Sequence, residues 1–422
     1  MSPSQNPLPD MAEPRHPVSV RDVVENGLCI GCGLCEALAP ARWQMTLTDA
    51  GRLRPAPLTA EDNAADAPIL AACPGAISEA VPQGTKEDAV WGSFTHMGEA
   101  WAGDPDIRFR AATGGLLTAL GVHLLRSGQA AFILHCGPDP QRPMRSSWRM
   151  SDTAADVIAN AGSRYGPTDT LAGLEAALAR GQRFAIIAKP CDAGAVRQRA
   201  KADPRLDALL VAVLVMVCGG ASDLGKSRAV LDEYALDEDD LTLFRYRGYG
   251  NPGRTRIETR DGRAFEKTYP EMWGDEAGWR IQTRCKLCAD AIGEAADIAA
   301  ADIWPGGGPT GEDAGLNGAI VRSPEGQALL DSAVAAGDVI LGRDHDPRDY
   351  DDFQPHQVSK KHSQAARLRG LAKGGLPVYR HAGLRLEALD TCDADQQTGA
   401  AARAAAGRFC ETMPKPETGD AG

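Results

Sequence analysis

Three cysteines lie close together near the N-terminus, in the run Cys29-Ile-Gly-Cys-Gly-Leu-Cys35. The C-x2-C-x2-C spacing is typical of a loop whose three thiolates bind one cubane iron–sulfur cluster. Gly31 and Gly33 let the backbone turn tightly, so that its amides can approach the sulfurs. A cubane needs a fourth thiolate, and Cys73, which directly precedes a proline, is the candidate.

A two-cluster ferredoxin has a further ligand four residues after the third cysteine, directly before a proline. In this chain that position is Ala39. We therefore interpret the stretch as a unit with one [4Fe-4S] cluster, held by Cys29, Cys32, Cys35 and Cys73. It resembles single-cluster bacterial ferredoxins over about residues 23–80. The alternative is a zinc site, although zinc knuckles usually pair two C-x2-C arms.

A second group of cysteines is spread more widely along the chain. Cys285 and Cys288 form a C-x2-C arm, whereas Cys191 and Cys218 each follow an apolar run that predicts a buried strand. Ligands bind at the carboxyl edge of open α/β sheets, so these four thiolates predict a second four-thiolate site. The alternative is that Cys191 and Cys218 are small buried apolar residues. Cys136, Cys392 and Cys410 have no partner spacing, and we expect them to be structural or incidental.

Alternating apolar and amphipathic segments indicate the elements that must position these groups. Strands are predicted at 131–134, 184–188 and 209–217, with helices at 168–180, 193–201 and 222–234. This alternation predicts an α/β fold (α+β overall), with a parallel or mixed sheet, flanking helices and a small ferredoxin-like iron–sulfur domain in front. A further helix is expected from Thr113, as its N-cap, to Leu125. Gly114 and Gly115 at its start would expose backbone N–H groups to an anion, although for the glycine pair taken alone a plain helix cap is the preferred interpretation.

Length and charge limit the remaining possibilities. A chain of 422 residues predicts two or three domains, and a net charge of −12 argues against a nucleic-acid surface and a polybasic membrane anchor. No apolar stretch is long enough to span a bilayer, and the N-terminus has no secretory signal pattern. Eleven cysteines without such a signal indicate a reducing compartment, so we expect a cytoplasmic protein.

Six motifs in one order resemble the coenzyme F-420 hydrogenase/dehydrogenase beta-subunit family, which also contains divinyl chlorophyllide reductases and plant hydroxymethyl chlorophyll reductase. They lie at 113–120, 162–167, 189–192, 247–250, 284–290 and 296–304. The resemblance covers about 90–345. The expected domains are a flexible arm (1–22), the ferredoxin-like unit (23–80), two halves of a flavin domain (90–175 and 176–345) and a C-terminal helical extension with a tail (346–422).

The resemblance implies a bound FAD flanked by cubane clusters. By this resemblance Thr113, Gly114 and Gly115 approach the FAD pyrophosphate, and Ser163, Arg164, Tyr165 and Lys189 line the flavin site. Cys191, Cys218, Cys285 and Cys288 hold the inner cluster. The chain departs from the family at Ala301, where many members have glycine. Its Lys-Pro-Cys-Asp run is nearer the hydrogenase-type members than the chlorophyllide reductases, which disfavours a tetrapyrrole substrate.

The expected function is an iron–sulfur flavoprotein oxidoreductase. Two [4Fe-4S] clusters and FAD would relay electrons between a one-electron carrier, a ferredoxin or another redox protein, and a small-molecule two-electron substrate. One alternative is a non-catalytic electron-transfer subunit of a larger hydrogenase or dehydrogenase complex. Others are a tetrapyrrole reductase and an iron–sulfur sensor without flavin. Arg367 could bind an anionic substrate, but a solvated helix face is the preferred interpretation of its surroundings.

Overall fold

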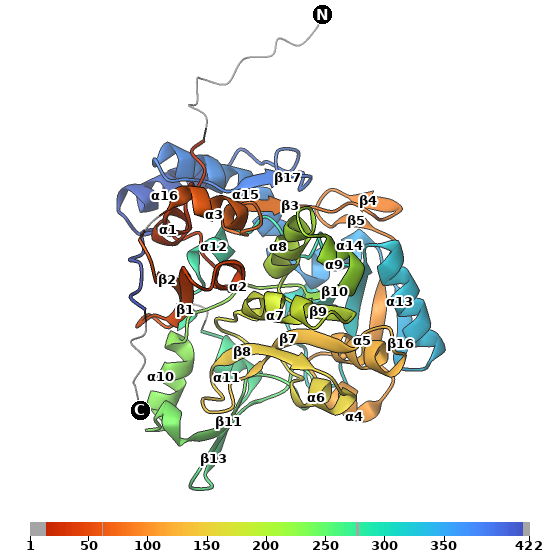
Figure 1. Cartoon of the computed structure of the whole chain (residues 1–422). Coiled ribbons are helices and arrows are strands. Elements are labelled where there is room, and N and C mark those ends of the chain that lie inside the picture. Colours follow the sequence, from red (N-terminus) through yellow and green to blue (C-terminus); the bar gives the residue numbers. More distant parts are fainter. Residues whose placement is uncertain (1–13, 61, 276–277, 417–422) are drawn as a thin grey trace, which may run out of the picture.

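A mixed sheet of eight strands lies at the centre of the molecule (Figure 1). The structure is a computed structural model that describes residues 14–60, 62–275 and 278–416. In order across the sheet, the strands are β16 (Val339–Asp344), β6 (His96–Ala102), β15 (Asn317–Val321), β14 (Ile298–Asp302), β10 (Leu210–Met216), β9 (Phe184–Ala188), β7 (Phe132–Pro138) and β8 (Ser146–Ser151).

The middle of this sheet is parallel and its flanks are antiparallel. Strands β14, β10, β9 and β7 run in one direction. On one side β15, β6 and β16 follow in antiparallel pairs, and on the other side β8 pairs antiparallel with β7. The predicted α/β fold with a mixed sheet is thus confirmed. The carboxyl ends of the four parallel strands meet at one edge, where a ligand can bind across several loops.

Helices cover both faces of the sheet. The core that includes Ile133 packs against α5 (Leu116–Arg126), α6 (Ala154–Ala159) and α13 (Pro324–Ala335). The core that includes Phe132 and Leu134 packs against α7 (Leu174–Ala179), α8 (Pro190–Ala200) and α9 (Pro204–Leu209). Successive residues of β7 thus enter opposite cores, as the two-residue period of a strand requires. Short helices α4 (Pro105–Arg110) and α14 (Pro347–Phe353) lie beside the antiparallel strands.

Several helix boundaries differ from those predicted. The helix expected at 168–180 is a 3-10 turn (Thr170–Gly173) followed by the short α7, and the one expected at 222–234 is α10 (Gly225–Glu233). The helix expected from Ala193 begins earlier, at Pro190, because proline is pre-set for the first turn of a helix. This shift places Cys191 inside the first turn of α8 rather than in a loop.

The N-terminal unit consists of short elements: α1 (Val20–Glu25), α2 (Leu34–Leu38), β1 (Trp43–Leu47), β2 (Leu53–Pro57), α3 (Asn63–Leu70) and β3 (Ile77–Glu79). Of the flexible arm expected at 1–22, residues 1–13 lie outside the described residues. The rest is docked: Ser19 caps α1, Arg15 pairs with Asp22 at 3.0 Å, and Arg15 O accepts a hydrogen bond from Val378 N. Sequence polarity alone did not reveal these contacts.

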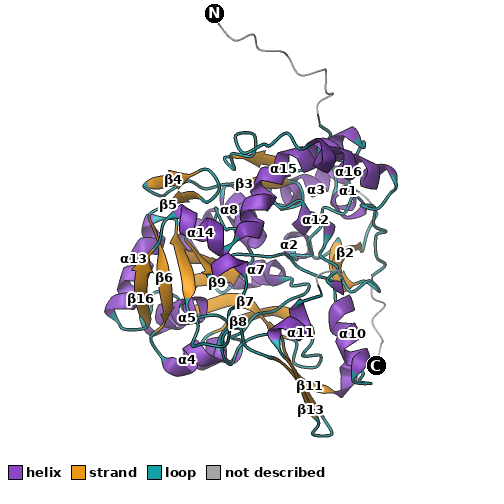
Figure 2. Cartoon of the chain, turned by 180° about the vertical axis from the view of Figure 1, so that it is seen from behind, coloured by secondary structure: helices purple, strands orange, loops and turns teal. Residues whose placement is uncertain are grey.

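The N-terminal unit and the C-terminal helices lie side by side (Figures 1 and 2). Strand β3 pairs with β17 (Arg380–Ala382), and one apolar core joins Val23 and Leu28 to Leu368 and Phe409. The C-terminal part of the chain forms α15 (Pro355–Lys373) and α16 (Ala394–Ala405). The N-terminal unit is therefore packed into the rest of the molecule.

The remaining elements complete the fold around this centre. They are the hairpin β4 (Lys86–Asp88) and β5 (Gly92–Phe94), the three-stranded sheet β11 (Leu241–Arg245), β12 (Thr255–Thr259) and β13 (Ala264–Lys267), and the short helices α11 (Tyr269–Trp273) and α12 (Thr283–Lys286). Within the described ranges, no helix is both long enough and apolar enough to cross a membrane.

Candidate functional site

Four cysteines of the N-terminal unit line one small cavity, and we call this group the outer cage. Cys29 and Cys32 come from the loop between α1 and α2, Cys35 from α2, and Cys73 from the turn after α3. The loop needs glycine at Gly31, whose φ is +75° and where a Cβ would stand 2.5 Å from Leu53 O. The predicted set of four therefore converges on one point.

The outer cage is buried and largely apolar. Val20, Val23, Leu34 and Ile69 line it beside the sulfurs. Burial raises the pKa of all four thiols, that of Cys73 to about 12, so the metal-free thiols are neutral at physiological pH. A metal that binds here takes the place of the protons.

Four further cysteines line a second cavity, and we call this group the inner cage. Cys191 follows β9, Cys218 follows β10, and Cys285 and Cys288 come from α12 and the turn after it. Adjacent parallel strands β9 and β10 bring the first two cysteines to one edge, as predicted. Ala221 N donates to Cys285 Sγ at 3.3 Å, and burial raises the pKa of Cys285 to about 12.

The spacing of these donors bears on which metal group fits. Within the described ranges, no group of three or more His, Cys, Asp or Glu side chains surrounds a single metal-ion position. Tetrahedral zinc, with Zn–S bonds of about 2.3 Å, would hold its sulfurs about 3.8 Å apart. A cubane places each thiolate on a different iron atom and so spaces the sulfurs more widely. Both cages offer four thiolates, and this donor chemistry fits a four-iron cluster.

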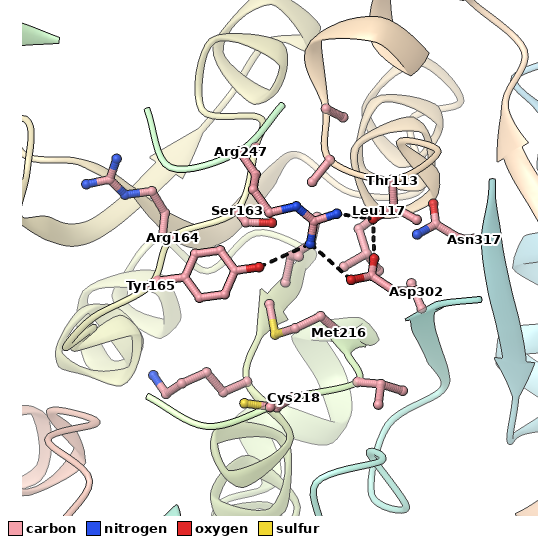
Figure 3. Close-up of a pocket in the computed structure, with 18 of the residues that line it drawn as sticks. Thr113, Leu117, Ser163, Arg164, Tyr165, Met216, Cys218, Arg247, Asp302 and Asn317 are labelled. Atoms are coloured by element: carbon pink, nitrogen blue, oxygen red, sulfur yellow. Dashed lines mark hydrogen bonds and ion pairs between the residues drawn. The ribbon is translucent and has the colours of Figure 1, made fainter. Parts of the chain in front are cut away.

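A cavity of about 370 Å³ opens at the carboxyl edge of the parallel strands (Figure 3). Its lining comes from β7, β9, β10 and β14 and from the loops that follow them. The volume and the mixture of apolar walls with a few polar groups are typical of a small-molecule or cofactor site.

A buried polar network crosses this cavity (Figure 3). Arg247 donates to Tyr165 Oη at 3.1 Å, to Asp302 Oδ2 at 3.0 Å and to Thr113 Oγ1 at 3.2 Å. The Thr113 hydroxyl donates in turn to Asp302. Burial alone lowers the pKa of Arg247, but Asp302 and Tyr165 outweigh burial and raise it. The arginine therefore stays charged and fixes the geometry of the wall.

Six of the seven predicted flavin-contacting residues line this cavity: Thr113, Gly115, Ser163, Arg164, Tyr165 and Lys189. Gly114 is not among the lining residues. A Cβ on Gly114 would stand 2.7 Å from Leu316 Cα, so Gly114 allows two chain segments to approach each other closely. Its predicted place at the pyrophosphate is not supported by its position.

Two of the six are cations whose donors are already used. The Arg164 guanidinium turns away from the network in Figure 3 and donates to Phe244 O at 3.0 Å and Pro143 O at 2.8 Å. Lys189 donates to Thr168 O at 3.0 Å and forms an ion pair of 2.8 Å with the fully buried Asp192. Both side chains therefore hold protein segments in place.

The start of helix α5 differs from the prediction in its cap. Gly115, with φ +75°, is the N-cap, because the Thr113 side chain is committed to Asp302. Leu116 N donates to Asn317 Oδ1 at 3.1 Å. Leu117 and Thr118 line the cavity, and within the described part of the chain no hydrogen bond uses their N–H groups. A helix start with free donors fits an anionic group such as a phosphate.

Gly219, after β10, gives the cavity a second open backbone segment. It lines the cavity, and a Cβ placed there would meet no atom within 4 Å. A bound molecule can therefore approach the main chain closely at this point. The free amides of α5 and this bare segment fit a dinucleotide such as FAD.

The three sites are contiguous. Ile30 lines both the outer and the inner cage. Lys189, Cys218, Gly220 and Ala221 line both the inner cage and the large cavity. The order in space is therefore outer cage, inner cage, large cavity.

Sequence reasoning assigned no role to Arg247 and Asp302, although both lie in motifs noted for the family resemblance. Each has neighbours far away in the chain, and no local spacing marks them as partners. Their place in two of the six motifs was the available signal.

Comparison with known proteins identifies relatives of the chain. Residues 97–175 match the N-terminal part, and residues 181–346 the C-terminal part, of the family described as coenzyme F420 hydrogenase/dehydrogenase, beta subunit. The F420-dependent formate dehydrogenase 1 subunit beta of Methanococcus maripaludis is 28% identical over 241 residues. The matched stretch spans 56% of this chain and 58% of that relative, so the chain covers less than two thirds of the relative's length.

Among solved structures, a chain of the F420-reducing [NiFe] hydrogenase complex from Methanosarcina barkeri, from a study of xenon derivatization, has a TM-score of 0.49 and 18% identity. It covers 66% of this chain and 96% of its own length. The two family matches follow one another in order and together span more than half of the 422 residues. The chain is therefore a member of the coenzyme F420 hydrogenase/dehydrogenase beta-subunit family.

Proposed function

We propose that this protein is an iron–sulfur flavoprotein oxidoreductase that relays electrons between a one-electron carrier and a two-electron substrate. The outer and inner cages would each hold a [4Fe-4S] cluster, and the large cavity would hold FAD. Clusters exchange single electrons, whereas a flavin can exchange one or two, and this difference makes the combination useful.

The contiguity of the three sites carries this proposal. Ile30 separates the two cages, and Cys218 belongs to the inner cage and to the wall of the cavity. Electron transfer between cofactors depends on short gaps filled with protein. A row of two four-thiolate cages that ends at a cofactor-sized cavity meets this requirement.

The protein's own residues would hold the groups and keep water away. The eight cysteines supply the thiolates, and the N–H groups of Leu117 and Thr118 would face the pyrophosphate. Tyr165 packs against Trp273, with ring centroids 4.0 Å apart, and Trp273 stacks on Trp279 at 4.2 Å. Tyr165 lines the cavity, and the two tryptophan rings would support it from behind.

The domain division follows from the same proposal. We propose that residues 90–175 and 176–345 form the two halves of one flavin domain, which agrees with the family matches at 97–175 and 181–346. The ferredoxin-like unit at 23–80 and the extension at 346–422 would add the outer cluster and a cover.

A second candidate is an electron-transfer subunit without a substrate of its own. The relative named as a subunit beta of a formate dehydrogenase favours it. To separate the two, the purified chain is given a one-electron donor and coenzyme F420. Reduction of F420 by the chain alone supports the oxidoreductase, whereas reduction only when a hydrogenase or dehydrogenase subunit is added supports the second candidate.

The cofactor content provides the direct test. Anaerobically purified protein is expected to carry about eight iron, eight acid-labile sulfide and one flavin per chain, by four-thiolate counting. A value near four iron would remove one cage from the proposal. Zinc in place of iron would overturn the assignment of iron–sulfur clusters, and iron without flavin would overturn the assignment of FAD.

A further inference from the structure

One face of helix α15 lies against the inner cage. Gln357 Nε2 donates to Cys218 O at 2.9 Å, and Gln364 Nε2 donates to Leu287 O at 2.7 Å, next to Cys288. Lys360 lies between these two on the helix and lines the inner cage. Positions separated by three and four residues share one face of a helix. This helix belongs to the C-terminal extension, outside the family matches.

The solvated helix face expected around Arg367 is therefore absent. Arg367 donates to Lys286 O at 2.8 Å and to Gln396 Oε1 at 3.1 Å, so its donors join protein segments. The same helix carries Lys361, which pairs with the buried Glu294. The basic side chains of α15 are thus divided between contacts with other protein segments and the inner cage.

Lys360 is the basic residue of α15 that lines the inner cage. Within the described ranges 14–60, 62–275 and 278–416, it forms no ion pair. Lys360 and the four inner cysteines line the same small cavity. The positive charge of Lys360 therefore acts directly on the inner sulfurs.

The buried cations near the cages are either paired with a carboxylate or shared between the two cages. Arg54, beside Cys29, is 1% exposed and pairs with Glu411 at 2.7 Å. Lys189 is paired with Asp192. Arg284 donates both to Pro74 O, after Cys73, and to Leu287 O, so its charge serves both cages.

We infer that Lys360 stabilises the reduced inner cluster and makes it the electron acceptor of the outer one. This inference rests on the proposed function. Reduction adds one negative charge to a cluster that its thiolates already make anionic, and an unpaired ammonium stabilises the added charge. In this step the outer cluster loses one electron, the inner cluster gains it, and no bond forms or breaks.

The test is an anaerobic redox titration followed by electron paramagnetic resonance. Lys360→Gln removes the charge with a similar shape, and Lys360→Arg restores the charge. Lys373→Gln is the matched control, because Lys373 is exposed on the same helix. Thirteen residues at 1.5 Å each place it about 20 Å along the axis. A Cys35→Ser background, which lacks an outer ligand, assigns the signals.

In Lys360→Gln, the inner cluster is expected to become harder to reduce. At a fixed solution potential near its midpoint, its ratio of reduced to oxidised form should fall about tenfold, the size of one charge acting in a partly polar interior. The midpoint potential of the outer cluster should stay near its wild-type value. In Lys373→Gln and Lys360→Arg, the potential of the inner cluster should also stay near wild type. An unchanged inner potential with full iron content overturns the role of Lys360 alone. Absence of an inner-cluster signal in the wild-type chain overturns the proposed function instead.

Discussion

The outer and inner cages present the same four donors on different scaffolds. Three outer cysteines lie in one short loop that starts after α1 and ends in α2. The four inner cysteines are spread from Cys191 to Cys288 and meet because β9 and β10 are parallel neighbours. A local loop can form a cage almost independently of the fold, whereas the inner cage exists only when the sheet has formed.

Their charges differ as well. The cation at the outer cage, Arg54, is offset by Glu411 from the C-terminal segment. The inner cage has the unpaired Lys360 from the C-terminal helix α15. The C-terminal part of the chain thus offsets the positive charge at the outer cage and adds a positive charge at the inner cage. Arg284 links the two cages through its hydrogen bonds to Pro74 O and Leu287 O.

The largest expected effect separates the two scaffolds. Cys35→Ser should lose about four iron per chain and keep its flavin, because Cys35 lies on the side of the outer cage formed by α2. Cys288→Ser should lose about four iron and also much of its flavin, because the inner cage shares a wall with the cavity. Iron, sulfide and acid-released flavin are measured per chain. Equal flavin in both variants would show that the cages do not differ in this way.

The next effect concerns the link between the cages. Arg284→Met removes the donors to Pro74 O at 3.0 and 2.8 Å and to Leu287 O at 3.0 Å, deep in the protein. Leaving these carbonyl groups unpaired should reduce the free energy of unfolding by about 2–4 kcal/mol. Thermal unfolding should begin at lower temperature, and iron should fall in both cages. Arg284→Lys keeps the charge and should restore part of the iron.

If Arg284→Met lowered the occupancy of one cage only, the residue would support that cage and would not link the two. Separate cluster signals in electron paramagnetic resonance distinguish these outcomes.

A smaller change tests the charge balance of the outer cage. Glu411→Gln keeps an acceptor oxygen but removes the negative charge of the carboxylate that lies 2.7 Å from the buried Arg54, which should cost about 1–3 kcal/mol of stability. With one negative charge removed, the outer cluster should become easier to reduce, and the difference between the clusters should narrow. Redox titration of the outer signal and a melting curve measure both effects. An outer potential that moved down would contradict the assigned sign.

The smallest effect lies where the inner cage joins the cavity. Gly219→Ala places a Cβ in open space, so stability should stay within about 0.5 kcal/mol of the wild type. Flavin occupancy should fall slightly, and Gly219→Val should lower it several-fold. Gly115→Ala is the contrasting control. Gly115 has a φ of +75°, and a Cβ there would stand 3.1 Å from Ile107 O, so Gly115→Ala should lower the melting temperature as well. Full flavin occupancy in Gly219→Val would show that Gly219 does not contact the bound cofactor.

Features that depend on local spacing could be predicted from the order of the residues alone. The C-x2-C-x2-C loop with its glycines converges whatever surrounds it, because the chain between the cysteines is too short to separate them far. Cys191 and Cys218 were placed together by a rule nearly as general, since parallel neighbouring strands end at one edge. The apolar runs that gave β9 and β10 were long and regular enough to be read directly.

Which charged groups act on the cages, and which hold protein segments, became clear from the folded chain. Arg164 and Lys189 had the sequence context of ligand-binding cations, yet neighbouring carbonyls and a carboxylate use their donors. Lys360 lay in a run that looked solvated, yet helix α15 packs it over the inner cage. The reason is physical: a charge acts according to its distance and its partners, and packing between remote segments sets both.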